Sequence, residues 1–418
     1  MKASYERPLG DGLILRTATG ERDVERVAEF NGAIHGPASI AMTHRLFTHH
    51  PNTQMEDLIF VEDEQSGQVV SSLCLIPWVW RYEDVEISAG EMGIVGTRED
   101  HRRRGLIRAQ VDHFKRRLRE RGCLLSQIQG IPYYYRQFGY EYALPLEGGL
   151  RIELRHVPAP PETPFTFRLV TLDDLPTLMR FYDEAAQEIA IHAARNEATW
   201  RYLLTHSIGT ETECETWLVQ DAGGRATGYV RLPKHHFGQE LVAGEVSRLG
   251  FDAALAVLHH LKTLALEREK PGIRLNLPAN CALMRLARSL DSHDLGAYAW
   301  QIHVPDLVAL LRALAPVLER RVAESPFAGL MCDVRLNLYH ESLLLRFEAG
   351  RMTEVANLDF GDDGEIRFPP LQLVPLVLGY RTVEELCAAY PDVRVAPAWR
   401  LLADTLFPKV TSFIYTIY

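Results

Sequence analysis

A basic, glycine-containing turn lies between an apolar run and an amphipathic segment about a quarter of the way along the chain. It reads Gly96-Thr97-Arg98-Glu99-Asp100-His101-Arg102-Arg103-Arg104-Gly105-Leu106-Ile107-Arg108. The first turn of a helix has backbone N–H groups without partners and the positive end of the helix dipole, so such a turn suits a pyrophosphate. Gly105 would let the backbone approach that anion closely. Three arginines alone more often form a solvated corner, but their place between a strand and a helix favours phosphate binding.

A cluster of aromatic residues follows about one strand further along the chain. It reads Tyr133-Tyr134-Tyr135-Arg136-Gln137-Phe138-Gly139-Tyr140. A phenol with a pKa near 10 can give its proton to a departing thiolate. Aromatic side chains beside a glycine more often pack in a core, and this is the role that we expect for Tyr133, Tyr134 and Tyr140.

The two motifs together resemble the GNAT superfamily of acetyltransferases. That superfamily has a phosphate loop Arg/Gln-x-x-Gly-x-Gly/Ala and a later Tyr four residues before a Gly-aromatic pair, which here are Arg102 to Ile107 and Tyr135. The sequence looks closest to the enhanced-intracellular-survival (Eis) family of multi-acetylating aminoglycoside acetyltransferases, in which the isoleucine at the last loop position is tolerated. The resemblance implies an N-acetyltransferase that moves an acetyl group from acetyl-CoA to a primary amine of an aminoglycoside, a polyamine or a lysine-like acceptor.

The resemblance also implies a role for each residue of the motifs. Val95 and Thr97, with Gly96 between them, would pair their strand backbone with the pantetheine arm of the coenzyme. The pyrophosphate would lie against Arg102, Arg103, Arg104, Gly105, Leu106, Ile107 and Arg108. Tyr135 would be the general acid that protonates the thiolate.

Two groups compete for the role of general base. In the Eis family the base is the C-terminal carboxylate, which here would belong to Tyr418, a Tyr in place of the family's Phe. An α-carboxyl with a pKa of about 3.3–3.7 is ionised at neutral pH, although burial would have to raise its basicity. The apolar run into Tyr418 suits insertion into the first domain, but it equally suits a strand packed on the last domain. Glu91, on the strand before the basic turn, could act through a water instead.

The elements that position these residues fall into three segments. Four prolines within residues 157–164 disfavour both helix and central strand and indicate a linker at 158–164. Residues 1–157 show the order β-α-β-β-β-α-β-α-β, and residues 165–300 repeat it. The second copy has Asp252 where the first has arginines, so we expect a degenerate GNAT-type domain without coenzyme. Residues 301–418 begin with a long helix at 305–323 and resemble the sterol-carrier-like domain of the Eis family. The fold class is therefore mixed α/β (α+β).

Composition excludes several classes of protein. A chain of 418 residues is too long for one core. A net charge of -10 and a pI near 5.9 disfavour nucleic acid and anionic membranes, although acidity mainly serves solubility. No apolar stretch reaches the roughly 18 residues of a membrane span, and the six cysteines form no CxxC pair.

We therefore expect a cytoplasmic, metal-free homo-oligomer. Two alternatives remain at this stage: a tandem transferase with another acyl or aminoacyl donor, and a non-enzymatic lipid carrier.

Overall fold

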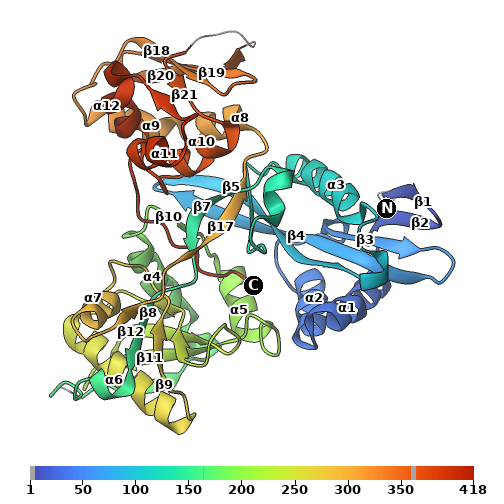
Figure 1. The fold of residues 1–418 in the computed structure, drawn as a ribbon. Coiled ribbons are helices and arrows are strands. Elements are labelled where there is room, and N and C mark those ends of the chain that lie inside the picture. Colours follow the sequence, from blue (N-terminus) through green and yellow to red (C-terminus); the bar gives the residue numbers. More distant parts are fainter. Residues whose placement is uncertain (1–4, 163, 359–363) are drawn as a thin grey trace.

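The computed structural model describes residues 5–162, 164–358 and 364–418 (Figure 1). Within them the chain forms a nine-stranded sheet, two four-stranded sheets and a five-stranded sheet, with helices packed on the sheets. This is the mixed α/β class that the sequence predicted. No helix of the described residues is long and apolar enough to cross a membrane.

The nine-stranded sheet carries both motifs. Its strands are, in spatial order, β1 (Glu6–Gly10), β2 (Leu13–Thr17), β3 (Leu58–Asp63), β4 (Gln68–Tyr82), β5 (Val85–Thr97), β6 (Leu125–Ile128), β17 (Tyr298–His303) and β7 (Glu141–Leu146), with β10 (Ile191–Ala193) paired to β4. Helices α1 (Glu21–His35) and α2 (Ala38–Thr48) cover one face, and α3 (Leu106–Glu120) covers the other (Figure 1). Between β2 and β3, where the predicted order has one helix, the structure has two, because Gly36 has φ of 112° and Pro37 follows it.

Strand β5 loses one of its two neighbours part-way along. It pairs with β4 from Val85 to Thr97 but with β6 only at Ala89–Glu91. A bulge then places Ile94 and Val95 opposite Leu73, and Ile94 has φ of 47°. Beyond Glu91, no described strand pairs with the edge of β5 that faces away from β4.

The first and second units of the chain exchange strands. β8 (Leu150–Glu153) precedes the linker but pairs between β15 (Gly272–Leu275) and β16 (His293–Asp294), in a sheet that also holds β13 (Leu241–Ala243). Conversely, β17 returns from the second unit and lies between β6 and β7. The expected boundaries at 157 and 300 cut across this exchange and, as domain boundaries, stay predictions.

Two consecutive glycines allow the crossing from β7 to β8. Gly148 and Gly149 have φ of 90° and 87°. A Cβ at Gly148 would overlap the carbonyl oxygen of Gly296, and one at Gly149 would overlap that of Leu275. Only glycine satisfies both the backbone conformation and the close approach.

The rest of the second unit is a four-stranded sheet with four helices. The strands are β14 (Glu245–Val246), β12 (Ala226–Pro233), β11 (Cys214–Gln220) and β9 (Thr166–Leu169). The helices are α4 (Leu175–Ala186), α5 (Glu197–Thr205), α6 (Phe251–Glu267) and α7 (Ala282–Arg288).

The third unit is a five-stranded sheet with five helices among the described residues. The strands are β20 (Arg351–Leu358), β19 (Ser342–Glu348), β18 (Cys332–Asn337), β21 (Ile366–Arg367) and β22 (Arg394–Val395). The helices are α8 (Leu307–Ala313), α9 (Ala315–Ala323), α10 (Pro370–Val377), α11 (Val383–Ala389) and α12 (Pro397–Leu406). The predicted helix at 305–323 is interrupted at Leu314, because Pro316 lacks an N–H for the helical ladder. The predicted strand at 353–359 corresponds to β20, and its last residue lies outside the described residues.

The chain after α12 runs back between the first and second units as an extended segment, residues 410–418, which we call the tail (Figure 1). Ala190 N donates to Thr411 O at 2.8 Å, and Phe413 N donates to Ile191 O at 3.0 Å. Tyr418 is buried in the first unit, beside Glu91. The alternative in which the final stretch packs only on the last unit is therefore wrong.

The strand exchange predicts that the chain stays together when its linker is cut. A protease site inserted between Pro160 and Pro161, in the exposed linker, should be cleaved while the two fragments co-elute in gel filtration. The reason is that β8 and β17 remain hydrogen-bonded in the opposite unit. Fragments that separate without denaturant would contradict the exchange, and the uncut chain is the control.

Candidate active site

Helix α3 begins with a backbone arrangement suited to an anion. Arg103 and Gly105, just before the helix, have φ of 64° and 76°. No side chain caps the helix and its first turn has no acidic residue. The first hydrogen bond of the helix runs from Ala109 N to Gly105 O. The N–H groups of residues 106–108 therefore have no partner among the described residues.

The arginines of the turn divide into two kinds. Arg104 pairs with Asp11 at 3.1 Å, and Arg108 donates to Gln137 Oε1 at 3.2 Å while lying over the Phe138 ring. The side chains of Arg102 and Arg103 make no ion pair or hydrogen bond with a described residue. A basic group at the positive end of a helix is repelled, so two uncommitted arginines there favour a bound anion.

A cavity of about 590 Å³ joins the helix start to the open edge of β5. It is lined by Ile34, Val95, Gly96, Thr97, His101, Arg102, Arg103, Gly105, Leu106, Ile107, Arg108, Ile131, Tyr134, Tyr135, Gln137 and Phe138. The structure thus brings together all the site residues predicted from the sequence except Arg104, Glu91 and Tyr418. Arg104 is outside because Asp11 holds its side chain.

Tyr135 is buried at the wall of this cavity, in the 3-10 turn Tyr134–Phe138. A Cβ on Gly130 would overlap the Tyr135 ring, so the ring packs directly against a glycine backbone. Burial raises the pKa of the Tyr135 phenol well above its usual value. Its hydroxyl makes no hydrogen bond with a described residue. The phenol is therefore a neutral proton donor at physiological pH.

The neighbouring tyrosines differ from the expectation of a shared core role. Tyr140 is buried and shares a hydrogen bond with Ser126 at 2.7 Å, as expected. Tyr134 lines the cavity at 36% exposure, and Tyr133 is 75% exposed. The core role was wrong for Tyr133, because its φ of 68° turns the chain outward before the 3-10 turn.

The two candidate bases are in contact with each other. The Tyr418 hydroxyl donates to Glu91 Oε1 at 2.9 Å, and the Tyr418 ring packs edge-on against Trp78. Glu91 is 2% exposed, and this burial raises the pKa of its carboxyl from 4.5 to about 8, with the Tyr418 hydrogen bond acting in the opposite direction. The Trp78 N–H lies nearby, but neither it nor Glu91 Oε2 makes a hydrogen bond of normal geometry. The phenol of Tyr418, rather than its backbone, touches Glu91.

The candidate acid and the candidate bases lie on opposite faces of the sheet. Tyr135 packs with Met92 and Phe114 on the α3 face. Tyr418 packs with Trp78 on the face that α1 and α2 cover. The open edge of β5 lies between the two faces. A molecule bound along that edge would therefore be accessible to Tyr135 from one face and to Glu91 and Tyr418 from the other.

Three polar residues near this centre escaped the sequence prediction. His35 ends α1 beside the β5 bulge; burial lowers its pKa, while Glu211 and the Val95 backbone act in the opposite direction. Glu211, from the second unit, hydrogen-bonds to Ser39 of α2. Gln127 of β6 is in register with Glu91 and is fully buried, and neither of its side-chain polar atoms has a hydrogen-bond partner among the described residues. The only signal for Gln127 was a polar residue inside an apolar strand.

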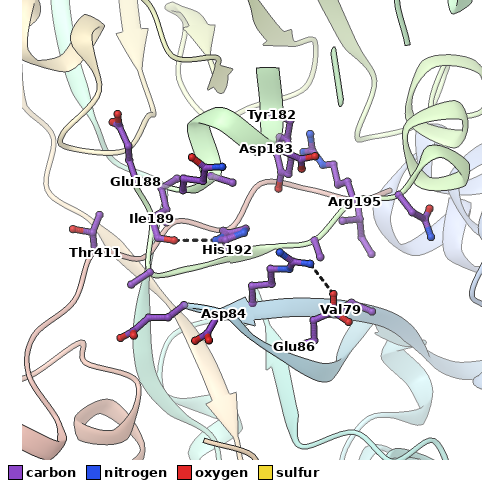
Figure 2. A pocket seen from close by; sticks show the side chains of 18 of the residues that line it. Val79, Asp84, Glu86, Tyr182, Asp183, Glu188, Ile189, His192, Arg195 and Thr411 are labelled. Carbon is purple, nitrogen blue, oxygen red and sulfur yellow. Dashed lines mark hydrogen bonds and ion pairs between the residues drawn. The ribbon is translucent and has the colours of Figure 1, made fainter. Parts of the chain in front are cut away.

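A second, larger cavity of about 1140 Å³ lies between the β4–β5 turn, α4 and the tail (Figure 2). Most of its carboxylates are already paired. Asp84 pairs with Arg320 at 2.8 Å, and Glu86 pairs with Arg81 at 3.0 Å. Asp183 makes no ion pair with a described residue, and burial raises its pKa. The wall is therefore less negative than its composition indicates.

Comparison with protein families identifies the first unit. Residues 17–143 match the model of the acetyltransferase (GNAT) domain. These residues are a GNAT acetyltransferase domain. The basic turn, the open edge of β5 and Glu91 all belong to the GNAT domain, as does Tyr135, and the chain is an acyltransferase.

Solved structures share the fold over the whole chain. A GCN5-related N-acetyltransferase from Anabaena variabilis is 16% identical with a TM-score of 0.70, covering 96% of this chain and 99% of that one. A probable N-acyltransferase from Enterococcus faecalis gives 14% and 0.71, with both chains fully covered. Eis1 from Mycobacterium abscessus gives 17% and 0.63, covering 97% of this chain and 100% of Eis1. At these identities the likeness concerns the fold, and no curated protein matches the sequence.

The second unit lacks the features that favour an anion at the start of α3. Its helix α6 follows Gly250, which has φ of -71°, and carries Asp252 in the first turn. A carboxylate there would repel a phosphate. Among the described residues, no group of three or more His, Cys, Asp or Glu side chains could hold a metal ion.

Burial of Glu91 predicts a pH-dependent stability. Its carboxyl keeps its proton in the folded chain up to about pH 8 but loses it near 4.5 when unfolded. The unfolding free energy should therefore fall as pH rises from about 4.5 to 8, by at most about 1.4 kcal/mol per unit. Replacing Glu91→Gln should flatten this slope in denaturant titrations. The control Glu86→Gln, an exposed carboxyl of the same strand, should keep it, and equal slopes in all three proteins would contradict the assignment.

Proposed function

We propose that the chain transfers the acetyl group of acetyl-CoA to a primary amine by direct attack in a ternary complex. The observation that carries the proposal is one cavity that joins uncapped helix amides, free arginines and an open strand edge to a buried tyrosine. Acetyl-CoA supplies a diphosphate, an amide-rich arm and an activated thioester. Each has a chemical counterpart among these groups.

The coenzyme's anionic part fits the start of α3. The N–H groups of residues 106–108 and the guanidinium groups of Arg102 and Arg103 are uncommitted donors, and charge-assisted hydrogen bonds to phosphate are strong. Arg108 is less free, because Gln137 already accepts from it. The pantetheine arm is a chain of amides, and it suits the unpaired edge of β5 at Val95, Gly96 and Thr97 as an added strand would.

Proton transfer is divided between the two faces of the sheet. We favour Glu91 as the proton acceptor. Its carboxyl has a pKa of about 8, which is much closer to the pKa of an ammonium group than that of an ordinary carboxyl is, so it accepts a proton from the substrate more readily. Tyr135 gives its proton to the sulfur when the carbon–sulfur bond breaks. The α-carboxylate of Tyr418 is the second candidate base; its backbone oxygen accepts from Thr416 Oγ1 at 3.0 Å.

The acceptor is proposed as a small primary amine. The net charge of -10 favours a cationic molecule by long-range attraction. Aminoglycosides, polyamines and lysine-like amines all meet this requirement, and thiol release from acetyl-CoA in the presence of each would rank them.

Acetyl-CoA binding should stabilise the chain through the arginines of the turn. At a hundred times its Kd it should add about 2.7 kcal/mol to the free energy of unfolding. Arg102→Ala should weaken binding about tenfold in a thermal-shift titration, because it removes one phosphate contact. Arg7→Ala, an exposed arginine of β1, is the matched control and should bind as the parent chain does. A shift with palmitoyl-CoA or with lipid, and none with acetyl-CoA, would favour the other acyl donor or the lipid carrier.

Tyr135→Phe separates catalysis from binding. It should lower kcat by about 10²-fold to 10⁴-fold, the range of general-acid catalysis, with the affinity for acetyl-CoA unchanged. Tyr134→Phe, in the same turn, should change kcat little. Unchanged turnover in Tyr135→Phe would remove this residue from the mechanism.

A further inference from the structure

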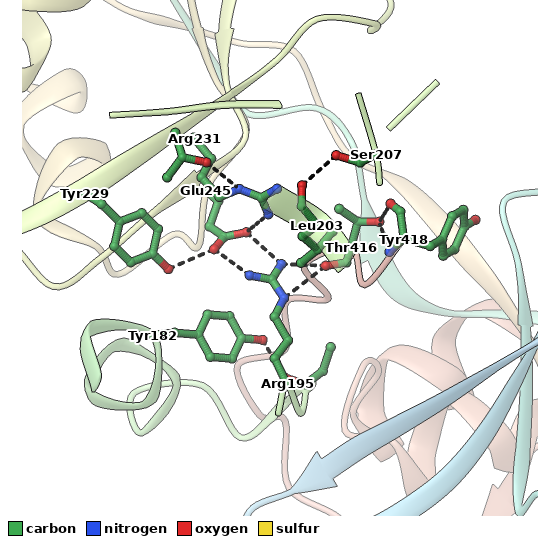
Figure 3. A network of polar contacts seen from close by, with 11 residues as sticks. Tyr182, Arg195, Leu203, Ser207, Tyr229, Arg231, Glu245, Thr416 and Tyr418 are labelled. Atoms are coloured by element: carbon green, nitrogen blue, oxygen red, sulfur yellow. Dashed lines mark hydrogen bonds and ion pairs between the residues drawn. The ribbon is translucent and has the colours of Figure 1, made fainter. Parts of the chain in front are cut away.

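A buried ionic cluster lies in the second unit, away from the GNAT cavity (Figure 3). Arg195 binds both oxygens of Glu245, at 2.7 Å each, and Arg231 binds the same carboxylate at 3.1 Å. Tyr229 also donates to Glu245, at 2.8 Å. Burial alone would raise the pKa of Glu245, but the two arginines hold it below its usual value.

Such a cluster needs an explanation other than stability. Removing two arginines and a glutamate from water costs several kcal/mol for each ion, and apolar residues of similar size often serve stability as well or better. A guanidinium does, however, fix direction, because its donors form a rigid planar fork. The role of the cluster therefore depends on what the Arg195 guanidinium binds besides Glu245.

The second edge of the Arg195 fork holds the tail. Its Nε donates to the carbonyl oxygen of Thr416 at 3.0 Å, and its Nη2 donates to the same oxygen at 2.5 Å. Figure 3 shows the guanidinium between Glu245 on one side and the Thr416 carbonyl on the other. Arg195 lies two residues after β10, the strand whose Ile191 O accepts a hydrogen bond from Phe413 N of the tail.

Fixing Thr416 fixes Tyr418. Only Ile417 separates the two residues, so a fixed carbonyl at Thr416 limits the positions that the Tyr418 side chain can reach. Thr416 Oγ1 also hydrogen-bonds to Tyr418 O at 3.0 Å, which ties the two together. A slip of one residue would bring Ile417 to the place where the Tyr418 hydroxyl meets Glu91.

We propose that Arg195, oriented by Glu245, is a positioning residue that sets the register of the tail and thereby delivers the Tyr418 hydroxyl to Glu91. The second unit would then serve the reaction without binding coenzyme, by holding the segment that completes the site of the first. The expected effect on turnover rests on the proposed function, whereas the expected effect on the position of the tail does not.

The test uses Arg195→Lys in the full chain, because lysine keeps the charge and loses the fork. Turnover should fall about 10-fold to 100-fold, as expected for a misplaced catalytic group, with the Kd of acetyl-CoA unchanged. Loss of the Tyr418 hydrogen bond should also move the acidic limb of the kcat profile to higher pH, because that bond lowers the pKa of Glu91. Arg225→Lys, an exposed arginine of the same unit that pairs with Asp221, should behave as the parent chain.

A double-variant cycle shows whether Arg195 acts through Tyr418. Tyr418→Phe removes the same hydrogen bond, so Arg195→Lys should displace the pH limb little further in the Tyr418→Phe background. Independent, additive displacements would overturn the proposal. Unchanged kcat and pH profile in Arg195→Lys would also overturn it.

Amide hydrogen exchange gives a readout that needs no activity. Residues 410–418 should exchange faster in Arg195→Lys, with α3 and β5 unchanged; equal protection of the tail would overturn the inference. If the parent chain shows no acetyl transfer but the tail is released, the proposed function fails while the positioning stands. Should Arg195→Lys not fold, Glu245→Gln, which keeps the shape of the partner and removes its charge, takes its place with the same expected results.

Discussion

The parting of β5 from β6 is the constraint on which the site depends. The two strands pair at only three residues, Ala89 to Glu91, and from there to Thr97 no described strand pairs with that edge of β5. An open edge inside a sheet is costly unless something else satisfies its amides. Tyr135 can face that edge from one side of the sheet and Glu91 from the other only because the sheet is divided there.

The three units contribute unequally to this one place. The first supplies the strand edge, the basic turn, Tyr135 and Glu91. The third supplies the tail by its position in the chain, and the second holds the tail through Arg195. The second unit, with Gly250 and Asp252 at the start of α6, lacks the features that favour an anion at α3, but its core carries a buried ionic cluster that stability alone does not explain.

Most features of the fold and of the site that could be predicted depend on residues that are contiguous in the chain. The basic turn and the tyrosine cluster are contiguous in the chain, so their strand and helix contexts could be read directly. The strands that periodicity predicts at 13–17 and 85–97 and the helix that it predicts at 251–268 correspond to β2, β5 and α6. Breaks due to proline at Pro37 and Pro316 were missed, because apolar periodicity continued through them. His35 and Arg195 carry no local signal, and Gln127 carries only that of a polar residue inside an apolar strand, since each acquires its surroundings from segments distant in the chain. Tyr418 was found only through family resemblance, and nothing in the sequence indicated that its phenol would bond to Glu91.

The exchange of β8 and β17 has a consequence for how the molecule is made. During synthesis β6 and β7 emerge some 150 residues before the strand that lies between them, so the nascent first sheet has a gap that only the finished second unit can fill. Non-local pairing of this kind slows folding and exposes strand edges meanwhile. The first unit, grafted alone into another protein, would accordingly lack an interior strand of its own sheet.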